Sequence, residues 1–157
     1  METNKPIHFL VYGVYIVTAK AQNCMNGMTV AWVTRISHIP ALVGINIQQH
    51  CFTREIIDKS NKFCINLLRE GQQELARHFG YCSGREKGKF FQVNYELDSN
   101  DLPVLKDSLG YISCQVEFSH NLGDHRLYVG RILKEECFYP QEKPLVYNHP
   151  DFQNLPR

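Results

Sequence analysis

The feature that most constrains the fold is a series of short runs rich in Val, Ile, Tyr and Phe, separated by turn residues. β-branched and aromatic side chains suit the pleated surface of a strand. The runs lie nearly consecutively at both ends of the chain, and this order favours antiparallel pairing into a barrel. The pattern fits a mainly β or an α+β domain, and we expect the former: an antiparallel, Greek-key-like β-barrel with short helices. The predicted strands are residues 9–19, 28–36, 41–47, 62–68, 109–118 and 126–135.

Two segments between these strands have a helical pattern. Residues 53–60 are predicted to form a short helix with Thr53 as its N-cap, although Ile56 stands where a capping box would have Glu. Residues 72–81 have apolar side chains at one helical face and are predicted to form an amphipathic helix that ends at Gly80.

Turns and a terminal arm complete the expected organisation. Residues 23–27 carry a turn signal, and Gly123 is predicted to form the tip of a hairpin between the last two strands. Residues 138–157 contain several prolines and no long period. We expect them to lie as an extended arm over the surface or over a partner subunit.

Length and charge narrow the class of protein. A chain of 157 residues fits one domain, over residues 1–157. Lys and Arg number 17 against 16 Asp and Glu, so the chain lacks the excess positive charge of a nucleic-acid binder, although a local anion pocket stays compatible. Residues 1–6 show no signal-peptide pattern, and no apolar run approaches the roughly 20 residues that cross a bilayer. We expect a cytoplasmic protein with neither a nucleic-acid nor a membrane partner.

The cysteines and histidines do not form a recognisable metal or redox motif. None of the six cysteines belongs to a CxxC pair, which structural zinc sites and dithiol motifs usually contain. His120, Asp124 and His125 lie close in sequence, but a hairpin tip commonly carries such residues and no fourth ligand is evident. We therefore expect buried or isolated thiols and no metal site. The cysteines are Cys24, Cys51, Cys64, Cys82, Cys114 and Cys137.

The common nucleotide and hydrolase motifs are missing as well. GxGxxG, HExxH and GxSxG do not occur. Residues 84–89 (GREKGK) resemble a P-loop only loosely, because three residues separate the glycines and Phe90 stands where Ser or Thr is required.

Three segments in order resemble the flavin reductase-like family, which has the FMN-binding split-barrel fold and includes flavoredoxin. They are residues 26–34 (NGMTVAWVT), 83–90 (SGREKGKF) and 123–130 (GDHRLYVG), and residues 143–148 (KPLVYN) also fit. The resemblance extends over roughly residues 8–150. It implies an antiparallel barrel, a homodimer, FMN near the dimer interface, and electron transfer from NADH or NADPH to the flavin.

An FMN phosphate needs cations or amides, and the basic segment offers them. Arg85 and Lys89 are four residues apart, so both face one side if the segment enters a helical turn, and Ser83 adds a hydroxyl group. The alternative is a solvated basic loop, which is the default for exposed charges. The resemblance favours the phosphate site, and it also implies that Phe90, in the same segment, is a cofactor-binding residue.

The flavin ring needs a dry slot and donors for its carbonyl groups. In residues 26–34 the small Ala31 lets a planar ring approach the backbone, whose N–H groups can bind the ring. Asn26 forms the preceding turn, Thr29 and Thr34 supply hydroxyl groups, and Trp32 either stacks nearby or fills the core.

The resemblance adds two further segments to the predicted site. Residues 47–53 are implied to lie along the flavin and its phosphate, through Gln48, Gln49 and Thr53. Many relatives have basic residues at Gln49 and His50, so here more of the phosphate charge is assigned to Arg85 and Lys89. His125 matches a family histidine that can orient the flavin or the nicotinamide, and we treat it as the candidate catalytic residue.

The expected function is hydride transfer from NADH or NADPH to FMN, followed by electron delivery to an acceptor such as a monooxygenase or a redox protein. One alternative is a flavoredoxin-type electron carrier that keeps FMN bound and reacts little with NAD(P)H. Another is a non-enzymatic binder of a different ligand such as haem, although no haem attachment motif supports it.

Overall fold

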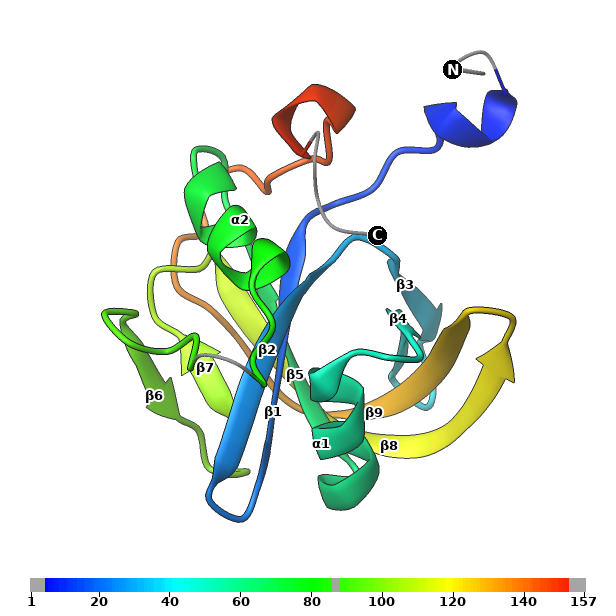
Figure 1. Cartoon of the computed structure of the whole chain (residues 1–157), viewed down its shortest axis with the longest axis vertical. Helices are drawn as coiled ribbons and strands as arrows, with labels where there is room; N and C mark the ends of the chain where they lie inside the picture. Colours follow the sequence, from blue (N-terminus) through cyan, green and yellow to red (C-terminus); the bar gives the residue numbers. More distant parts are fainter. Residues whose placement is uncertain (1–4, 86–87, 153–157) are drawn as a thin grey trace.

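One antiparallel sheet of seven strands forms most of the molecule (Figure 1). The structure is a computed structural model that describes residues 5–85 and 88–152. Its strand order is β2-β1-β5-β8-β9-β4-β3, and a separate pair, β6 and β7, lies beside it. The strands are β1 (Tyr15–Ala21), β2 (Cys24–Val30), β3 (Val33–Ser37), β4 (Leu42–Gln48), β5 (Lys62–Leu67), β6 (Tyr95–Leu97), β7 (Pro103–Leu105), β8 (Gly110–Leu122) and β9 (His125–Cys137). The prediction of a mainly β, antiparallel fold is confirmed.

The sheet is bent into a barrel by the way its two edges are joined. β2 and β3 lie at opposite edges, yet only Ala31 and Trp32 separate them in the chain. Three Cα–Cα steps span at most about 11 Å, so the edges must approach each other at this point. The backbone N–H of Asn46 on β4 donates to the carbonyl of Trp32 at 3.0 Å and holds the link in place.

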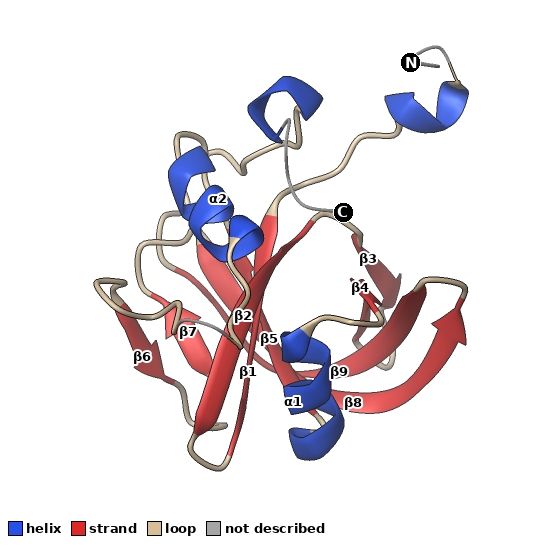
Figure 2. Cartoon of the chain, in the orientation of Figure 1, coloured by secondary structure: helices blue, strands red, loops and turns tan. Residues whose placement is uncertain are grey.

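Two helices cover different parts of this sheet (Figure 2). α1 (Phe52–Ser60) buries Ile56 and Ile57 in the main core, together with side chains such as Phe63 of β5 and Tyr128 of β9. α2 (Gln73–Tyr81) buries Ala76 and Phe79 in a second core. That second core also contains Phe90 and Leu145, so it joins α2 to the C-terminal segment. Neither helix, with nine residues each, nor any other helix in the described residues is long and apolar enough to span a membrane.

The C-terminal segment is tied to its own chain by backbone hydrogen bonds. Leu145 accepts from the N–H of Val14 at 3.0 Å and donates to the carbonyl of Leu68 at 2.8 Å. The N–H of Tyr147 donates to the carbonyl of Tyr12 at 2.7 Å. A short 3-10 helix, η2 (His149–Phe152), follows. Residues 145–147 therefore lie against their own chain, and a contact of the arm with a partner subunit stays a prediction.

The structure corrects several predicted boundaries in the first half of the chain. The first strand begins at Tyr15 instead of residue 9, because Pro6–Phe9 forms a 3-10 helix, η1. The predicted strand 28–36 is two strands, since the link at Ala31 and Trp32 crosses from one sheet edge to the other. The turn is at Gln22 and Asn23, where Gln22 has a φ of 56°, rather than over residues 23–27.

The two helix boundaries also differ from the predicted ones. Cys51, rather than Thr53, is the N-cap of α1, and Gly80 lies inside α2 instead of ending it. The short strands β6 and β7 were not predicted from the sequence. By contrast, β4 and β5 lie within one residue of their predicted bounds, and Gly123 has a φ of 62° at the predicted hairpin tip. The strand predicted over residues 109–118 continues to Leu122 as β8, so the hairpin loop is shorter than predicted.

Candidate functional site

Most of the predicted phosphate-site residues line one cavity of about 270 Å³. It lies where β2, the start of α1, the end of α2 and the basic segment after α2 meet. The cavity brings together Asn26, Thr29, Gln48, Thr53, Ser83, Arg85 and Lys89, which are spread over more than sixty positions of the sequence. The other lining residues are Met28, His50, Cys51, Phe52, Phe79, Gly80, Tyr81, Cys82 and Gly84.

A buried polar contact joins three of the cavity's walls. The side-chain amide of Asn26 on β2 donates to the hydroxyl oxygen of Thr53 on α1 at 3.0 Å, and both side chains are buried. Gly84 packs directly on this amide, because a Cβ at position 84 would lie 2.2 Å from Oδ1 of Asn26. The basic segment can therefore approach β2 this closely only with glycine at that position.

The N-terminus of α1 opens into the same cavity. Its N-cap, Cys51, makes no side-chain capping bond of normal geometry, so the N–H groups of Phe52 and Thr53 keep free donor capacity. Phe52 and Thr53 of this first turn line the cavity. Free N–H groups and the positive end of a helix favour an anion. Burial raises the pKa of the Cys51 thiol, although the N–H and charge of Arg54 oppose this effect, so the thiol stays protonated at neutral pH.

Arg85 reaches the cavity while paired with an acid of α1. Its Nη1 donates to Oε2 of Glu55 at 3.0 Å, and its Nη2 donates to Oε1 of the same carboxylate. The guanidinium carbon also lies 5.0 Å from the centre of the Phe52 ring. The hydrogen bond from Arg85 holds the pKa of Glu55 below its usual value. Glu55 thus stays ionised and occupies one edge of the guanidinium.

Lys89 reaches the cavity from the interior. Its Nζ donates to the carbonyl of Gly27 at 2.9 Å and to the carbonyl of Phe79 at 2.8 Å. Burial lowers the pKa of this ammonium group. Two of its three donors are used, which leaves one for a ligand. Residues 83–85 and 88–90 are not helical, and the predicted helical turn between Arg85 and Lys89 includes residues 86–87, which lie outside the described residues.

A second group of predicted residues lies at the link between β2 and β3. The Trp32 ring, with 45% of the residue exposed, lies 4.7 Å from the His125 ring and 6.4 Å from Tyr12 (centroid distances). Within residues 5–85 and 88–152, no acceptor is found for the N–H groups of Ala31 and Trp32. The link therefore offers two adjacent backbone donors beside an exposed aromatic surface.

The hairpin tip is fastened next to this aromatic surface. Gln49 donates from its side chain to the carbonyl of Gly123 at 2.6 Å, and from its N–H to the carbonyl of Asp124 at 3.0 Å. Nδ1 of His125 lies 2.6 Å from Oδ1 of Asp124, which fixes the ring orientation. No group of three or more His, Cys, Asp or Glu that could hold a metal ion occurs in the part of the chain that the structure describes.

Of three further predicted residues, Thr29 and Phe90 make structural contacts within the chain, whereas Thr34 makes only a weak one. The hydroxyl of Thr29 donates to the carbonyl of Ala76 at 2.5 Å and ties β2 to α2. Phe90 is buried and its ring packs on Phe79 and Tyr95. Thr34 lies exposed on β3 and bonds only weakly to the carbonyl of Arg35, at 3.4 Å. A direct role of these three in ligand binding stays a prediction.

Several lining residues were not predicted. Phe52 and Tyr81 line the cavity. Glu55 does not line it, but its carboxylate accepts hydrogen bonds from the Arg85 guanidinium. The sequence held no signal for them, because the contacts join residues some thirty positions apart. Gly84 lay within the resembling segment but was not singled out, although its position between Ser83 and Arg85 was a usable signal.

The two buried thiols stay protonated at neutral pH. Cys64 and Cys114 are buried, as predicted, and burial raises the pKa of Cys64 far above its usual range and that of Cys114 to about 12. All six cysteines are free.

Comparison with known proteins gives a consistent result. The family model described as "Flavin reductase like domain" matches residues 7–156. The chain is 33% identical over 145 residues to the high molecular weight rubredoxin of Moorella thermoacetica, covering 91% of this chain and 63% of that protein. It is 27% identical over 141 residues to diflavin flavoprotein A 1 of Synechocystis, covering 86% of this chain and 25% of that protein. The chain thus spans less than two thirds of both relatives.

Two further matches have lengths closer to that of this chain. An NADH-dependent flavin reductase of a Rhodococcus species is 29% identical over 147 residues, covering 91% of this chain and 79% of that protein. The solved structure of flavin reductase PheA2 in its native state superimposes with a TM-score of 0.76 and 30% identity, covering 88% of this chain and 86% of that one.

Proposed function

Because the chain belongs to the flavin reductase-like domain family, we propose that it is an FMN-binding oxidoreductase that transfers a hydride from NADH or NADPH to the flavin and passes the electrons to an acceptor. The observation that carries this proposal is the cavity at the N-terminus of α1, where Arg85 and Lys89 converge on free helix N–H groups.

The donors of the cavity fit a phosphate monoester. Helix N–H groups, one guanidinium and one buried ammonium surround it, and Ser83 and Gln48 add polar groups. A volume of about 270 Å³ is slightly below the roughly 300–1,000 Å³ usual for ligand pockets, so it suits the phosphate and sugar-like chain rather than a whole flavin. The ring would then lie beyond the cavity.

The β2–β3 link fits that ring. The free N–H groups of Ala31 and Trp32 can donate to ring carbonyl or nitrogen atoms, and the small Ala31 side chain leaves room for a flat group. Trp32 and His125 form an apolar and partly exposed surface next to them. The bound flavin would supply the redox chemistry, which this chain's side chains cannot. The residues' own part is to bind the ring, to exclude water and to orient it.

His125 is the residue proposed to act closest to the reacting atoms. Its ring is held by Asp124 and by contact with Trp32, so its position is fixed before a ligand arrives. We propose that it orients the nicotinamide against the flavin. Holding two rings in contact is sufficient to account for a large part of the rate of such a transfer.

We also propose that the chain forms a homodimer. The exposed aromatic surface at Trp32 leaves the ring site open on one side, which a second copy could cover.

Homology to a high molecular weight rubredoxin and to a diflavin flavoprotein also supports a second candidate function, an electron carrier with permanently bound FMN and little NAD(P)H activity. The acceptor would be a redox protein or a monooxygenase.

An absorbance titration separates the two candidates. The purified protein is saturated with FMN, desalted, and mixed with NADH or NADPH without oxygen. Flavin bands that bleach within the mixing time support the reductase, and bands that persist until a reduced redox protein is added support the carrier. Trp32 is the only tryptophan, so quenching of its fluorescence by FMN reports binding at the link independently of turnover. Absence of both flavin bands and quenching would refute the proposed function.

A further inference from the structure

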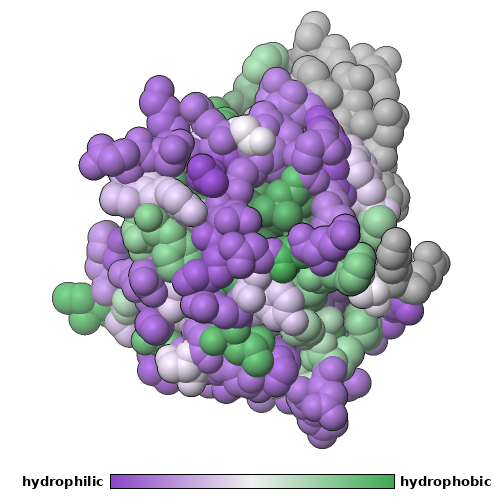
Figure 3. Space-filling view, turned by 90° about the vertical axis from the view of Figure 1, so that its left-hand side faces the viewer, coloured by the Kyte–Doolittle hydropathy of each residue, from purple (hydrophilic) through white to green (hydrophobic). Residues whose placement is uncertain are grey.

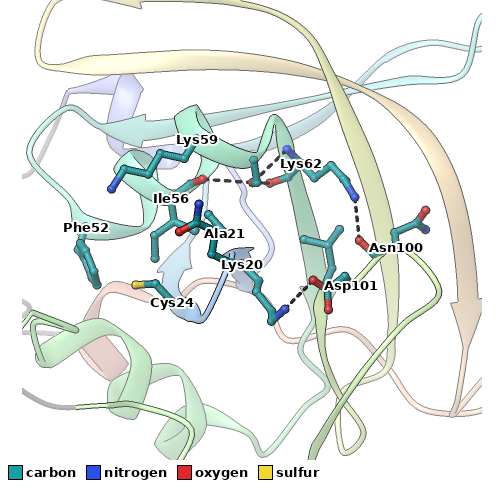
Figure 4. A pocket seen from close by; sticks show the side chains of 12 residues that line it. Lys20, Ala21, Cys24, Phe52, Ile56, Lys59, Lys62, Asn100 and Asp101 are labelled. Carbon is teal, nitrogen blue, oxygen red and sulfur yellow. Dashed lines mark hydrogen bonds and ion pairs between the residues drawn. The ribbon is translucent and has the colours of Figure 1, made fainter.

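A second cavity, larger than the small cavity at Arg85 and Lys89, lies between the β1–β2 turn, α1 and the turn that joins β6 to β7. Its volume is about 640 Å³, within the roughly 300–1,000 Å³ usual for small organic ligands. Figure 4 shows Cys24 and Phe52 at one end of it and Asn100 and Asp101 at the other. None of the residues predicted for the flavin site lines this large cavity.

The charge of the large cavity is positive. Lys20, Lys59 and Lys62 line it against one carboxylate, that of Asp101, which leaves an excess of two positive charges. Asp101 pairs with Lys20 at 2.5 Å. Lys62 donates one hydrogen bond to the carbonyl of Asn100 at 3.0 Å, and no acceptor for Lys59 is found within residues 5–85 and 88–152. Because an ammonium group has three donors, Lys59 and Lys62 both retain donors for an anion.

The end of α1 opposes an anion here, and the lysines outweigh it. Lys59 and Ser60 belong to the last turn of α1, where the helix carries about half a negative charge. The two excess ammonium charges exceed this opposing charge. The small cavity differs, because the N-terminus of α1 itself adds positive charge there. In the large cavity side chains alone select an anion.

The same cavity also has an apolar wall. The half-buried Phe52 lies at one end of it, and the buried side chains of Ile56 and Leu102 form part of its lining. Lysines that only face solvent would have no such wall beside them. The lining therefore suits a molecule that joins an anionic head to an apolar body.

The wall opposite α1 is a hydrogen-bonded turn. The Asp98 carboxylate accepts from the N–H groups of Asn100 at 2.9 Å and Leu102 at 3.0 Å. The backbone closes the same turn, since the N–H of Asp101 donates to the carbonyl of Asp98 at 3.0 Å. Asn100 and Asp101, which hold two of the lysines, are therefore in place without a ligand, and the cavity is preformed.

We propose that the large cavity binds an organic anion with an apolar body, separately from the flavin and from the nicotinamide cofactor. A carboxylate or phosphate monoester head accepts hydrogen bonds from Lys59 and Lys62, and the apolar body lies against Phe52. The site does not depend on the proposed function, because neither these lysines nor the turn at Asp98 takes part in the flavin site.

The first test combines one apolar body with four heads. Protein-observed NMR titrations measure the affinities of phenylbutyrate, phenylbutyl phosphate, phenylbutanol and phenylbutylamine. We expect both anions to bind at least tenfold more tightly than the neutral and the cationic compound, and the tighter anion identifies the natural head. Inorganic phosphate, which has no apolar body, should bind more weakly than phenylbutyl phosphate. Equal affinities of the four compounds would overturn the proposal.

The titrations are repeated with saturating FMN, because a phosphate monoester also fits the small cavity. We expect the affinity of phenylbutyrate to stay the same in the presence of FMN or NADH. Displacement of phenylbutyrate by either cofactor would show that the large cavity belongs to the cofactor site, and would overturn the proposal.

Variants of the two lysines with free donors test the anion contact. In Lys59→Gln/Lys62→Gln the affinity for phenylbutyrate should fall about tenfold, or about 1.4 kcal/mol, which is within the contribution of two exposed charge pairs. FMN affinity should not change. Lys106→Gln/Lys134→Gln removes the same charge outside both cavities and should change neither affinity.

A single variant guards against an effect on the fold. Lys59→Gln leaves the hydrogen bond between Lys62 and Asn100 intact, so a disturbed turn does not account for its effect. We expect it to lower the affinity for phenylbutyrate about threefold. Unchanged affinity in both lysine variants would overturn the proposal.

Alkylation of Cys24 gives a readout in the cavity itself. Cys24 is exposed and lines the large cavity, whereas Cys137 is exposed and lines neither cavity. Iodoacetamide reacts with both thiols, and mass spectrometry of peptides measures each rate. Bound phenylbutyrate should slow alkylation of Cys24 several-fold and leave that of Cys137 unchanged. Equal rates at Cys24 with and without saturating phenylbutyrate would place the anion elsewhere and overturn the proposal.

The outcomes separate this site from the proposed function. Protein that binds phenylbutyrate in the large cavity but no flavin would refute the flavin-dependent function and leave the anion site standing. Protein that binds and reduces FMN but no organic anion would refute only the anion site.

Discussion

Gly84 is a position of the site where the structure leaves no room for a side chain. In Gly84→Ala the new Cβ would lie 2.2 Å from Oδ1 of Asn26, so the loop or the buried amide must move. Movement of the amide breaks the Asn26–Thr53 hydrogen bond. Loss of a buried hydrogen bond costs about 1–3 kcal/mol. We expect lower thermal stability and weaker FMN binding, measured by thermal unfolding and Trp32 quenching. Gly88→Ala is the control, because a Cβ there meets no atom of residues 5–85 or 88–152 within 4 Å.

Glu55 is predicted to weaken phosphate binding by occupying Arg85. In Glu55→Gln the guanidinium is released toward the cavity, and FMN should bind about two- to fivefold more tightly, as expected for an exposed ion pair. Riboflavin lacks the phosphate, so its affinity should not change. Glu74→Gln removes a carboxylate that pairs with Arg77 on α2 and serves as the control.

A double-variant cycle decides whether Glu55 acts through Arg85. If it does, Glu55→Gln has no effect on FMN affinity in an Arg85→Met background. An effect of the same size in that background would mean that Glu55 acts by its charge alone. Weaker FMN binding in Glu55→Gln would instead mean that the acid holds Arg85 in its binding position.

At the scale of elements, the turn between β6 and β7 depends on one carboxylate. Burial raises the pKa of Asp98, but hydrogen bonds from Ser113 and from the N–H groups of Leu102 and Asn100 outweigh it and leave the pKa below 3.8. A lowered carboxyl pKa stabilises the folded state above the unfolded value and loses this contribution as the pH falls through the folded value.

Asp98→Asn should therefore lower the free energy of unfolding near neutral pH by about 1.5–3 kcal/mol, the usual contribution of hydrogen bonds to a charged group. Urea unfolding from about pH 6 to pH 3 measures it, and the difference from wild type should shrink toward the acidic end. A constant difference over this range would show that ionisation of Asp98 does not stabilise the turn. Asp107→Asn, at an exposed partner of Asn94, is the control.

At the scale of the whole molecule, exposed apolar side chains concentrate in the segment before β1. Ile7, Phe9, Leu10 and Val11 are 60%, 71%, 53% and 80% exposed. Figure 1 shows this segment extending away from the barrel. On the face that carries β6, by contrast, hydrophobic residues form separate patches among hydrophilic ones (Figure 3). A concentrated apolar segment of this kind marks an interaction surface.

We expect the segment to contribute to a homodimer. Phe9→Ser/Val11→Ser should shift the molar mass measured by light scattering from dimer to monomer, with an unchanged circular dichroism spectrum because neither residue is in the core. Phe91→Ser, at another exposed aromatic residue, should leave the dimer intact. A wild-type monomer at micromolar concentration would contradict the dimer, and a dimer that survives the double variant would place its interface elsewhere.

The sequence by itself determined the elements whose signals are local. Runs of apolar residues predicted β4 and β5, and the turn chemistry of Gly123 predicted the β8–β9 hairpin, because both depend on neighbours in the chain. The resembling segments also predicted residues that line the small cavity, among them Asn26, Arg85 and Lys89.

Only the tertiary structure decided the rest, because it depends on contacts between distant residues. No local pattern in residues 28–36 distinguishes one strand from two, and the break at Ala31 and Trp32 follows from the closure of the sheet. The pairing of Arg85 with Glu55 and the burial of Lys89 against Gly27 and Phe79 join positions 10–62 residues apart. The small cavity at Arg85 and Lys89 exists only because α1 packs beside β2, and packing of this kind is set by the curvature of the whole sheet.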